Sequence, residues 1–331
     1  MASNFWEAQR KARSRTSLYI LLFIVLTAGI AVGAEVLLRM FAYEDYNPQF
    51  PYLGLFIVCI TCFVAGYNYL MYKQYGGSYV AESVGGRLVT KNTQSFKETQ
   101  LLNIVEEMAI AASVAVPKVY ILPANQINAF AAGLDQSQAA VAVSQGCLDR
   151  LNRDELQGVV GHEIGHIYNR DMRITMILAA MIAGFFVILY LGLRMLQFAP
   201  QSRYEERSSN GQKKGGSPVI VIAFTLLIAG AVSWLAGKII ASSISRQREY
   251  LADACAVQFT RNPDGIVGAL KKIHQDSVND MPHDAMAFSQ MFLNDTSVLS
   301  SLFATHPPLE KRISAILGRT YSFDPKDKPK D

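Results

Sequence analysis

Cysteine and histidine are scarce in this sequence, and it contains no pattern typical of nucleic-acid binding. Four cysteines in 331 residues provide no disulfide framework. Cys59 and Cys62 form a C-x-x-C, but they lie in an apolar run where a charged thiolate site would be costly, so we interpret them as packing residues. No basic run is interleaved with aromatic residues, which argues against nucleic acid as a partner. With only five histidines in the chain, two that lie close together are informative.

Long apolar runs, in contrast, are abundant. Half of the residues are hydrophobic, and they concentrate in four runs of the roughly 20 residues that span a bilayer, at 18–38, 51–72, 174–198 and 218–243. The first run follows four basic residues and could be read as a signal peptide. Its apolar character continues to Leu38, beyond an ordinary signal sequence, and a second run follows closely. We therefore predict a membrane anchor.

The distribution of lysine and arginine predicts the orientation in the membrane. Segments 1–17, 73–173 and 245–331 hold 24 such residues, whereas 41–50 and 199–217 hold four. The cytoplasmic loops of membrane proteins are enriched in basic residues, so this distribution predicts which side of the membrane each segment of a multi-pass protein occupies. Its N-terminus and both long polar segments are expected on the cytoplasmic side. The four basic residues at 199–217 oppose this weakly, in a stretch whose composition is typical of a flexible linker.

We predict that the two long polar segments form one domain, which a membrane hairpin interrupts in the chain. We predict an α+β protein that consists of an N-terminal arm with two transmembrane helices (1–72), the first part of the polar domain (73–173), a transmembrane hairpin (174–243) and the second part of the domain (244–331). Helical spacing of apolar residues predicts a helix at 95–114. The stretches KVYIL, NAFAAG and AAVAVS, separated by turn residues, predict a small β-meander. Asn152 and Glu155 have the spacing of a capping box at the start of a further helix.

The polar domain contains GHEIGH at 161–166, which matches the pattern HExxH. By composition this pattern is expected roughly 0.003 times in such a chain. Four residues of a helix turn about 400°, so His162 and His166 would share one face and could reach one tetrahedral ion. Zinc lowers the pKa of a bound water towards about 7, and Glu163 is predicted to take its proton as the water attacks a carbonyl. A helix with two structural histidines is the alternative, and it would carry the cost of burying these polar groups.

A third protein ligand decides the class of the site. In a metzincin the pattern would continue as HExxHxxGxxH, but Asn169 and Met172 occupy the glycine and histidine positions. A gluzincin takes a glutamate from a separate helix, and REYLAD supplies Glu249 and Asp253, four residues apart and therefore on one helix face. We predict Glu249 as the third ligand and Asp253 as the acceptor that fixes the tautomer of a ligating histidine. The alternative is a solvated acidic pair on a charged helix.

Together these motifs resemble the HtpX-type membrane zinc metalloproteases, relatives of the CAAX prenyl proteases. The resemblance covers residues 80–320 and rests on VGHEIGHIYNRD and SRQREYLADACAV, with GGRLV, VPKVYILPANQINAFAAG, VSQGCLDRLNRDELQGVVGHE and THPPLEKRI. It implies four transmembrane helices plus a mainly helical, gluzincin-like zinc peptidase domain with one Zn²⁺ per subunit. The implied function is a zinc-dependent endopeptidase of the cytoplasmic (inner) membrane, in quality control of misfolded or damaged membrane proteins. Four spans are too few for the enclosed chamber of the CAAX enzymes, which makes prenylated substrates the weaker alternative.

The resemblance also indicates residues beyond the metal ligands. Asn128, Ala129 and Phe130 resemble the edge strand on which gluzincins bind substrate, where an extended peptide gains main-chain hydrogen bonds regardless of its sequence. A plain core strand is the alternative. His306, in a His-Pro motif of the family, could polarise the scissile carbonyl or cap the metal in a resting state. It could equally be a structural residue that opens a proline-started helix.

Both predicted metal-bearing helices abut membrane spans. His166 lies eight residues before Ile174, and Ser243 lies six residues before Glu249. We therefore expect the metal to lie close to the bilayer surface and to act on segments that leave the membrane. The expected partners are membrane-protein or unfolded polypeptide substrates and the lipid bilayer, and the sequence leaves an oligomer open.

Two functions of other classes remain as alternatives. A scaffold that keeps zinc only for stability would not need Glu163. A metal transporter would place its ligands within the spans near the bilayer midplane, whereas the predicted ligands lie outside them. Three further residues have weaker assignments: Arg246 could pair with a carboxylate of the site, and His274 and His283 are expected to be surface histidines.

Overall fold

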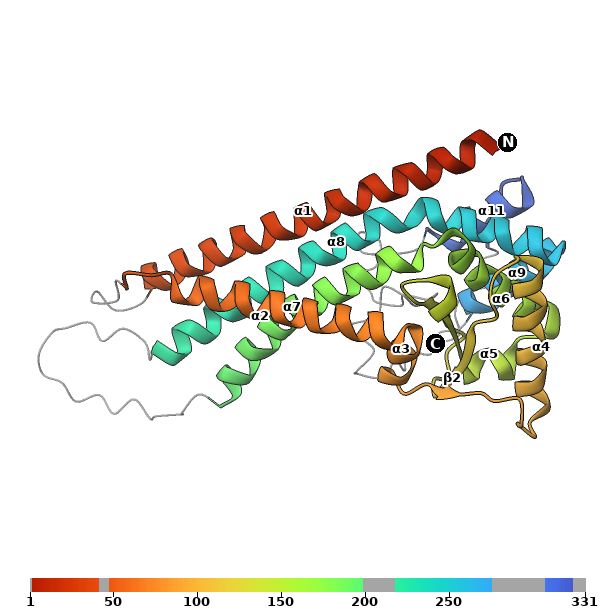
Figure 1. Cartoon of the computed structure of the whole chain (residues 1–331), viewed down its shortest axis with the longest axis horizontal. Helices are drawn as coiled ribbons and strands as arrows, with labels where there is room; N and C mark the ends of the chain where they lie inside the picture. Colours follow the sequence, from red (N-terminus) through yellow and green to blue (C-terminus); the bar gives the residue numbers. More distant parts are fainter. Residues whose placement is uncertain (1, 42–47, 199–217, 276–306, 324–331) are drawn as a thin grey trace, which may run out of the picture. The chain divides into compact units, whose positions relative to one another are not determined.

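The computed structural model describes residues 2–41, 48–198, 218–275 and 307–323, which divide into two compact units (Figure 1). The first unit contains the described residues up to Tyr67 and Ala180–Lys238, and the second contains Asn68–Ala179 and those from Ile239 onward. Three long helices contribute to both units: α2 (Tyr52–Tyr75), α7 (Met172–Gln197) and α8 (Pro218–Thr260).

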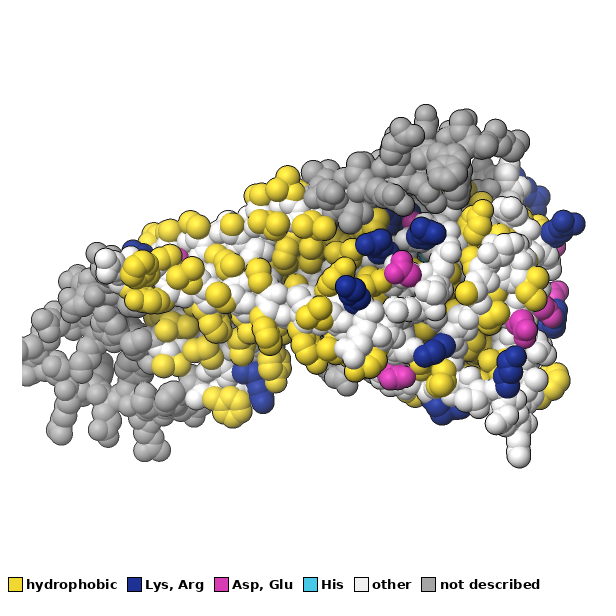
Figure 2. All heavy atoms as spheres, in the orientation of Figure 1, with side chains coloured by type: hydrophobic (Ala, Val, Ile, Leu, Met, Phe, Trp, Pro, Cys, Tyr) yellow, Lys and Arg dark blue, Asp and Glu magenta, His cyan; other side chains and the backbone are white. Residues whose placement is uncertain are grey.

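The first unit is a bundle formed by α1 (Ala2–Phe41) and parts of α2, α7 and α8 (Figure 1). Each of these helices contains a stretch that is long and apolar enough to cross a membrane, at Ile20–Phe41, Tyr52–Tyr75, Met172–Gln197 and Val219–Ile240. The four apolar runs predicted from the sequence are therefore found as helices. Large hydrophobic side chains are exposed along them, which is the surface expected of helices that face lipid (Figure 2).

Glycines let the helices of this bundle approach closely. A Cβ atom on Gly184 of α7 would lie 2.9 Å from the backbone oxygen of Thr61 in α2, and one on Gly230 of α8 would lie 2.4 Å from the backbone nitrogen of Leu189 in α7. Side chains at these positions would force the helices apart. Small residues at helix contacts are typical of membrane bundles, where van der Waals packing drives association.

One carboxylate is buried in the bundle. Glu35 of α1 accepts hydrogen bonds from the backbone nitrogens of Leu53 (3.0 Å) and Gly54 (3.2 Å) at the start of α2, and it pairs with Arg39 at 3.0 Å. The first N–H groups of a helix have no partner within the helix, so a carboxylate from a neighbouring helix stabilises this end of α2. This contact explains an acidic residue inside an apolar span without a separate functional site.

The second unit contains a four-stranded sheet in the order β1 (Arg87–Leu88), β2 (Lys118–Leu122), β4 (Ala140–Ser144) and β3 (Ala129–Ala132). β2 pairs antiparallel with β1 and parallel with β4, and β3 pairs antiparallel with β4. The three predicted strands are present, but the sheet is mixed and its order is not that of the expected meander. The difference lies in the pairing: β4, and not β3, forms the parallel ladder with β2, and β3 pairs with the other side of β4. Both strands are buried along their whole length, so alternation and burial do not distinguish the central strand from the end strand.

Helices pack around this sheet. They are α3 (Gly77–Ser83), α4 (Phe96–Ala111), α5 (Gln145–Arg150), α6 (Arg153–Asn169), α9 (Pro263–Gln275) and α11 (Leu309–Leu317), together with the end of α8. α6 is the central element, because it packs against α9, α4 and the strands β3 and β4. The main hydrophobic core of the unit includes Val159, Val160, Ile164 and Ile167 of this helix, all of them fully buried.

Both ends of α6 are held by side chains. The predicted capping box is confirmed: Asn152 Oδ1 accepts a hydrogen bond from the Glu155 backbone nitrogen (2.9 Å), and Glu155 Oε2 accepts one from the Asn152 backbone nitrogen (2.8 Å). Gln136, in the short 3₁₀ helix η1 (Gln136–Gln138), donates from Nε2 to the carbonyl oxygens of Ile167 (3.1 Å) and Tyr168 (3.2 Å). The Ile167 carbonyl also accepts from the Arg170 backbone nitrogen at 3.1 Å, so Gln136 adds a second donor there. Carbonyls at a helix C-terminus lack the regular partner that the rest of the helix provides.

Glycines of α6 allow α8 to lie directly on it. A Cβ atom on Gly161 would lie 3.3 Å from Cα of Ala256, and one on Gly165 would lie 3.2 Å from Cα of Ala252. This close approach brings the backbone of α8 alongside the GHEIGH segment. Residues of α8 within one helical turn of Ala252 can therefore reach the histidines.

A third glycine of α6 supports a stability prediction. A Cβ atom on Gly158 would lie 2.5 Å from the backbone nitrogen of Ile266 in α9, so Gly158→Ala must displace one helix. We expect a loss of about 1–3 kcal/mol, the usual cost of overpacking, seen as a lower midpoint in thermal unfolding of the purified protein. Gly66→Ala in α2, where nothing lies within 4 Å of the added Cβ, is the matched control and should not lower the midpoint. Equal midpoints for both variants would contradict this packing.

Candidate metal centre

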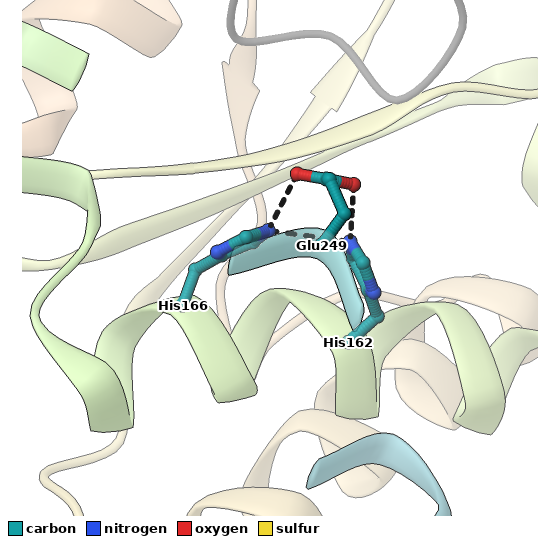
Figure 3. Close-up of side chains that lie close together, drawn as sticks. All are labelled: His162, His166 and Glu249. Carbon is teal, nitrogen blue, oxygen red and sulfur yellow. Dashed lines mark hydrogen bonds and ion pairs between the residues drawn. The ribbon is translucent and has the colours of Figure 1, made fainter. Parts of the chain in front are cut away.

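Three of the predicted residues converge at one point of the second unit. The Nε2 atoms of His162 and His166 lie 3.2 Å apart on α6, and both face the Glu249 carboxylate on α8 (Figure 3). His162 Nε2 lies 3.6 Å from Glu249 Oε2, and His166 Nε2 lies 3.5 Å from Glu249 Oε1. All three donor atoms are within 4.8 Å of one another. The four-residue spacing on α6 and the close packing of α8 are what produce this geometry.

The donor set fits a divalent metal ion. His162 and Glu249 are buried, and the His166 side chain is 17% exposed. Two imidazole nitrogens and one carboxylate oxygen are ligands that zinc prefers, and three protein ligands leave a coordination position for another group. Within the described residues, no other set of three such side chains comes this close together.

Asp253 holds the outer side of the first histidine. Its Oδ1 lies 2.9 Å from His162 Nδ1, so a neutral His162 that donates from Nδ1 leaves Nε2 as the free electron-pair donor. Arg312 of α11 in turn donates to both oxygens of Asp253, from Nε at 2.9 Å and from Nη2 at 2.6 Å. Arg312 is fully buried, and its Nη1 lies 3.6 Å from Glu249 Oε2. One arginine therefore contacts both carboxylates of α8.

The charges of this cluster shift its proton equilibria. Burial raises the pKa of Asp253, but the charge and hydrogen bonds of Arg312 outweigh it and hold the pKa below the ordinary 3.8. Such a carboxylate stabilises the fold above pH 3.8, and this contribution is lost as the pH falls through its lowered pKa. Burial lowers the pKa of His162 and His166, but nearby carboxylates outweigh it and raise both above 6.5. Protons therefore compete with a metal ion for the two imidazoles as the pH falls.

Glu163, the predicted general base, lies next to the first histidine on α6. Glu163 is 3% exposed. Its negative charge contributes to the raised pKa of both His166 and Arg312. Glu163 therefore interacts electrostatically with a predicted metal ligand and with the buried arginine. The catalytic role of Glu163 stays a prediction.

The predicted substrate strand lies at one end of the sheet. β3 contains Ala129 and Phe130, and it is the last strand in the order that the described residues form. Asn128, just before it, is buried; its backbone nitrogen donates to Ser144 Oγ at 3.0 Å, and its Oδ1 accepts from the Ala129 backbone nitrogen at 2.9 Å. Asn128 thus anchors the start of the strand. Substrate binding along β3 stays a prediction.

Of the remaining residues considered in the sequence, three lie outside the part whose side chains the structure describes, and one can be placed. His306 and His283 lie outside the described residues, as does the side chain of Arg246. His274 of α9 stacks on Phe323, with ring centroids 3.6 Å apart and planes 6° from parallel. This contact gives His274 a packing role away from the metal cluster.

Arg312 is the residue of the cluster to which the sequence reasoning gave no role. It belongs to the motif THPPLEKRI, which contributes to the family resemblance. A signal was present, because Leu309, Ile313 and Ile316 pack on the core and Arg312 falls within the same stripe. An arginine on the buried face of a short helix requires a buried acidic partner, and Glu249 and Asp253 on one face of another helix are candidates for it.

Comparison with known proteins identifies the family to which the chain belongs. Residues 95–320 match the profile of peptidase family M48. A protease HtpX homologue of Thermoanaerobacter pseudethanolicus is 39% identical over 267 residues, which are 80% of this chain and 85% of that protein. One of Streptococcus pyogenes serotype M28 is 34% identical over 310 residues, 92% and 96% of the two chains. The crystal structure of S. mikatae Ste24p aligns with a TM-score of 0.45 and 17% identity, over 92% of this chain and 67% of that one.

The family profile spans more than half of the chain, and both HtpX relatives are matched over most of their own length. With four helices that can cross a bilayer, the protein is a membrane protein. The predicted resemblance to HtpX proteases is confirmed, and the chain belongs to peptidase family M48.

Proposed function

We propose that this M48 peptidase is a zinc-dependent endopeptidase whose metal is held by His162, His166 and Glu249. The observation that carries the proposal is the convergence of three donor atoms of the types zinc prefers, within 4.8 Å of one another. Zinc, when bound, supplies a Lewis acid that polarises a carbonyl and lowers the pKa of water. The described residues contain a single such cluster, which corresponds to one zinc ion per subunit.

The chain's own residues supply the remaining chemistry. Glu163 acts as general base: its carboxylate takes the proton of the attacking water and then delivers it to the amide nitrogen that leaves. Asp253 keeps the proton of His162 on Nδ1, 2.9 Å away, so that Nε2 stays available as a ligand. β3 holds the substrate main chain in an extended conformation, which presents a peptide bond without selecting its side chains.

We further propose that the substrates are unfolded or damaged membrane proteins and that the peptidase domain lies on the cytoplasmic side. The spacing along the chain supports this: Glu249 lies nine residues after the candidate span Val219–Ile240, and His166 lies six residues before the span that begins at Met172. Basic residues concentrate in the segments assigned to the cytoplasm. Such an enzyme acts in quality control of the membrane.

Metal removal tests the proposed mechanism. The purified full-length protein in detergent should cleave an unfolded polypeptide such as casein, and 1,10-phenanthroline should stop cleavage as zinc leaves the protein. Adding Zn²⁺ at stoichiometric amounts should restore the rate, whereas Mg²⁺ should not, because two imidazoles favour zinc over a hard cation. Unchanged cleavage by a protein shown by elemental analysis to contain no metal would contradict the proposal.

The substrate class requires its own comparison. In proteoliposomes, a destabilised membrane protein should be cleaved faster than soluble casein at equal concentration. The reason is that α8, which bears Glu249, also contains a candidate membrane span, and a short turn joins α6 to the candidate span of α7. Equal rates for both substrates would contradict the membrane-protein assignment while leaving the peptidase activity intact.

A further inference from the structure

A second aspartate lies at the turn that joins α6 to α7. α6 ends at Asn169, and Arg170 adopts the left-handed conformation with φ 58°. The backbone nitrogen of Asp171 donates to the carbonyl oxygen of His166 at 3.0 Å, and its own carbonyl accepts from Ile174 at 3.2 Å in the first turn of α7. The backbone therefore fixes Asp171 just beyond His166, where the candidate membrane span of α7 begins.

The side chain of Asp171 lies between a histidine and an arginine. Its Oδ2 lies 3.6 Å from His166 Nδ1, and its Oδ1 lies 3.4 Å from Arg248 Nε on α8. Asp171 is 8% exposed, and Oδ2 is buried without a hydrogen-bond partner among the described residues. A buried acceptor without a donor is destabilising, and the potential donor that faces Oδ2 is Nδ1 of the His166 ring.

This arrangement repeats that of the other histidine. His162 has Asp253 at Nδ1, and Arg312 holds Asp253; His166 has Asp171 at Nδ1, and Arg248 contacts Asp171. In both rings Nε2 is left facing Glu249. The repeat uses different elements, because Asp253 and Arg248 come from α8, Arg312 from α11 and Asp171 from the α6–α7 turn.

We propose that Asp171 is a positioning residue for the metal site: it orients His166 through Nδ1, and Arg248 keeps its carboxylate in place. The HExxH pattern is thereby extended to HExxHxxxxD in this chain. The inference rests on the proposed zinc site and adds a residue that acts on zinc affinity through His166. Acidic groups that hold the outer nitrogen of a ligating histidine typically change metal affinity by about 10–100-fold.

A purely structural role for Asp171 makes a different prediction. If the aspartate only caps α7 and ties it to α8, its removal lowers the thermal midpoint of the metal-free protein and leaves zinc affinity unchanged. The test therefore measures zinc affinity by competition with a chelating dye, on the full-length protein in detergent. The absorption spectrum of the Co²⁺-loaded protein, which reports on ligand geometry, is recorded alongside it.

Asp171→Ala should weaken zinc binding by about 10–100-fold and alter the Co²⁺ spectrum. Asp171→Asn keeps the size and an acceptor oxygen without the charge, so it should fold and fall between Asp171→Ala and the wild type. Arg248→Gln should weaken zinc binding less than Asp171→Ala. Asp154→Ala, in the exposed first turn of α6, is the matched control and should keep wild-type affinity.

Zinc affinity of both Asp171 variants within twofold of the wild type would overturn the positioning role, whatever happens to the thermal midpoint. A wild type that binds no zinc at all would overturn the proposed function, and this inference with it. The two failures are therefore distinguishable.

Discussion

Glu163→Gln is expected to reduce peptide-bond hydrolysis by about 10²–10⁴-fold while zinc content stays at the wild-type level. Glutamine has the same shape but does not accept the proton of the attacking water, so it removes the general base and leaves the metal ligands intact. The measurement is kcat/KM on a fluorogenic peptide or on unfolded casein, together with elemental analysis of each preparation. A rate loss without metal loss separates the peptidase from a protein that keeps zinc only for stability.

Glu106→Gln in α4 is the matched control, because it makes the same substitution at an exposed position outside the cluster. It should keep the wild-type rate. Were Glu163→Gln to cleave as fast as Glu106→Gln at equal zinc content, Glu163 would not be the base. A Glu163→Gln protein that has lost its zinc would instead indicate that the glutamate helps to hold the metal.

The second large effect is expected on removal of Arg312. Arg312→Met leaves Asp253 and Glu249 buried without their cation, and breaking a buried ion pair typically costs about 3–5 kcal/mol. We expect a lower thermal midpoint of the metal-free protein and weaker zinc binding, because Asp253 then no longer holds His162 firmly. Arg312→Lys should restore little, since a single ammonium group does not reproduce the contacts of the guanidinium with both Asp253 oxygens.

A double variant sharpens this test. Arg312→Met combined with Asp253→Asn removes the buried charge as well as its partner, so part of the lost stability should return while zinc affinity stays low. Arg319→Met, at an exposed position after α11, is the matched control and should behave as the wild type. A midpoint for Arg312→Met equal to that of Arg319→Met would contradict the assigned role of the buried arginine.

The parts of the fold that could be predicted from the sequence depend on local signals. The start of α6 follows from Asn152 and Glu155, whose capping box needs only residues three apart. The four apolar helices follow from length and composition alone. The order of strands does not, because β4 enters the centre of the sheet through contacts with β2 that are distant in sequence, and turn residues carry no information on them.

The candidate site shows the same division. His162 and His166 are related by helix geometry, and Glu249 and Asp253 share a helix face, so residue types and spacing suffice to single them out. That α8 lies against α6 depends on glycines of α6, a signal that could not be interpreted before the structure. The pairing of Arg312 with Asp253 and of Asp171 with His166 joins separate elements, and no spacing rule predicts such contacts.

X-ray absorption at the zinc edge of the purified wild-type protein, compared with Glu249→Ala, tests the metal centre most directly. For the wild type we predict one zinc ion per chain, with two imidazole nitrogens at about 2.0–2.1 Å and a carboxylate oxygen at about 2.0–2.2 Å. Glu249→Ala should bind zinc more weakly and should change the edge shape and the number of neighbours in the first coordination shell. A sulfur neighbour at about 2.3 Å, or a wild-type spectrum that Glu249→Ala leaves unchanged, would contradict the proposed centre.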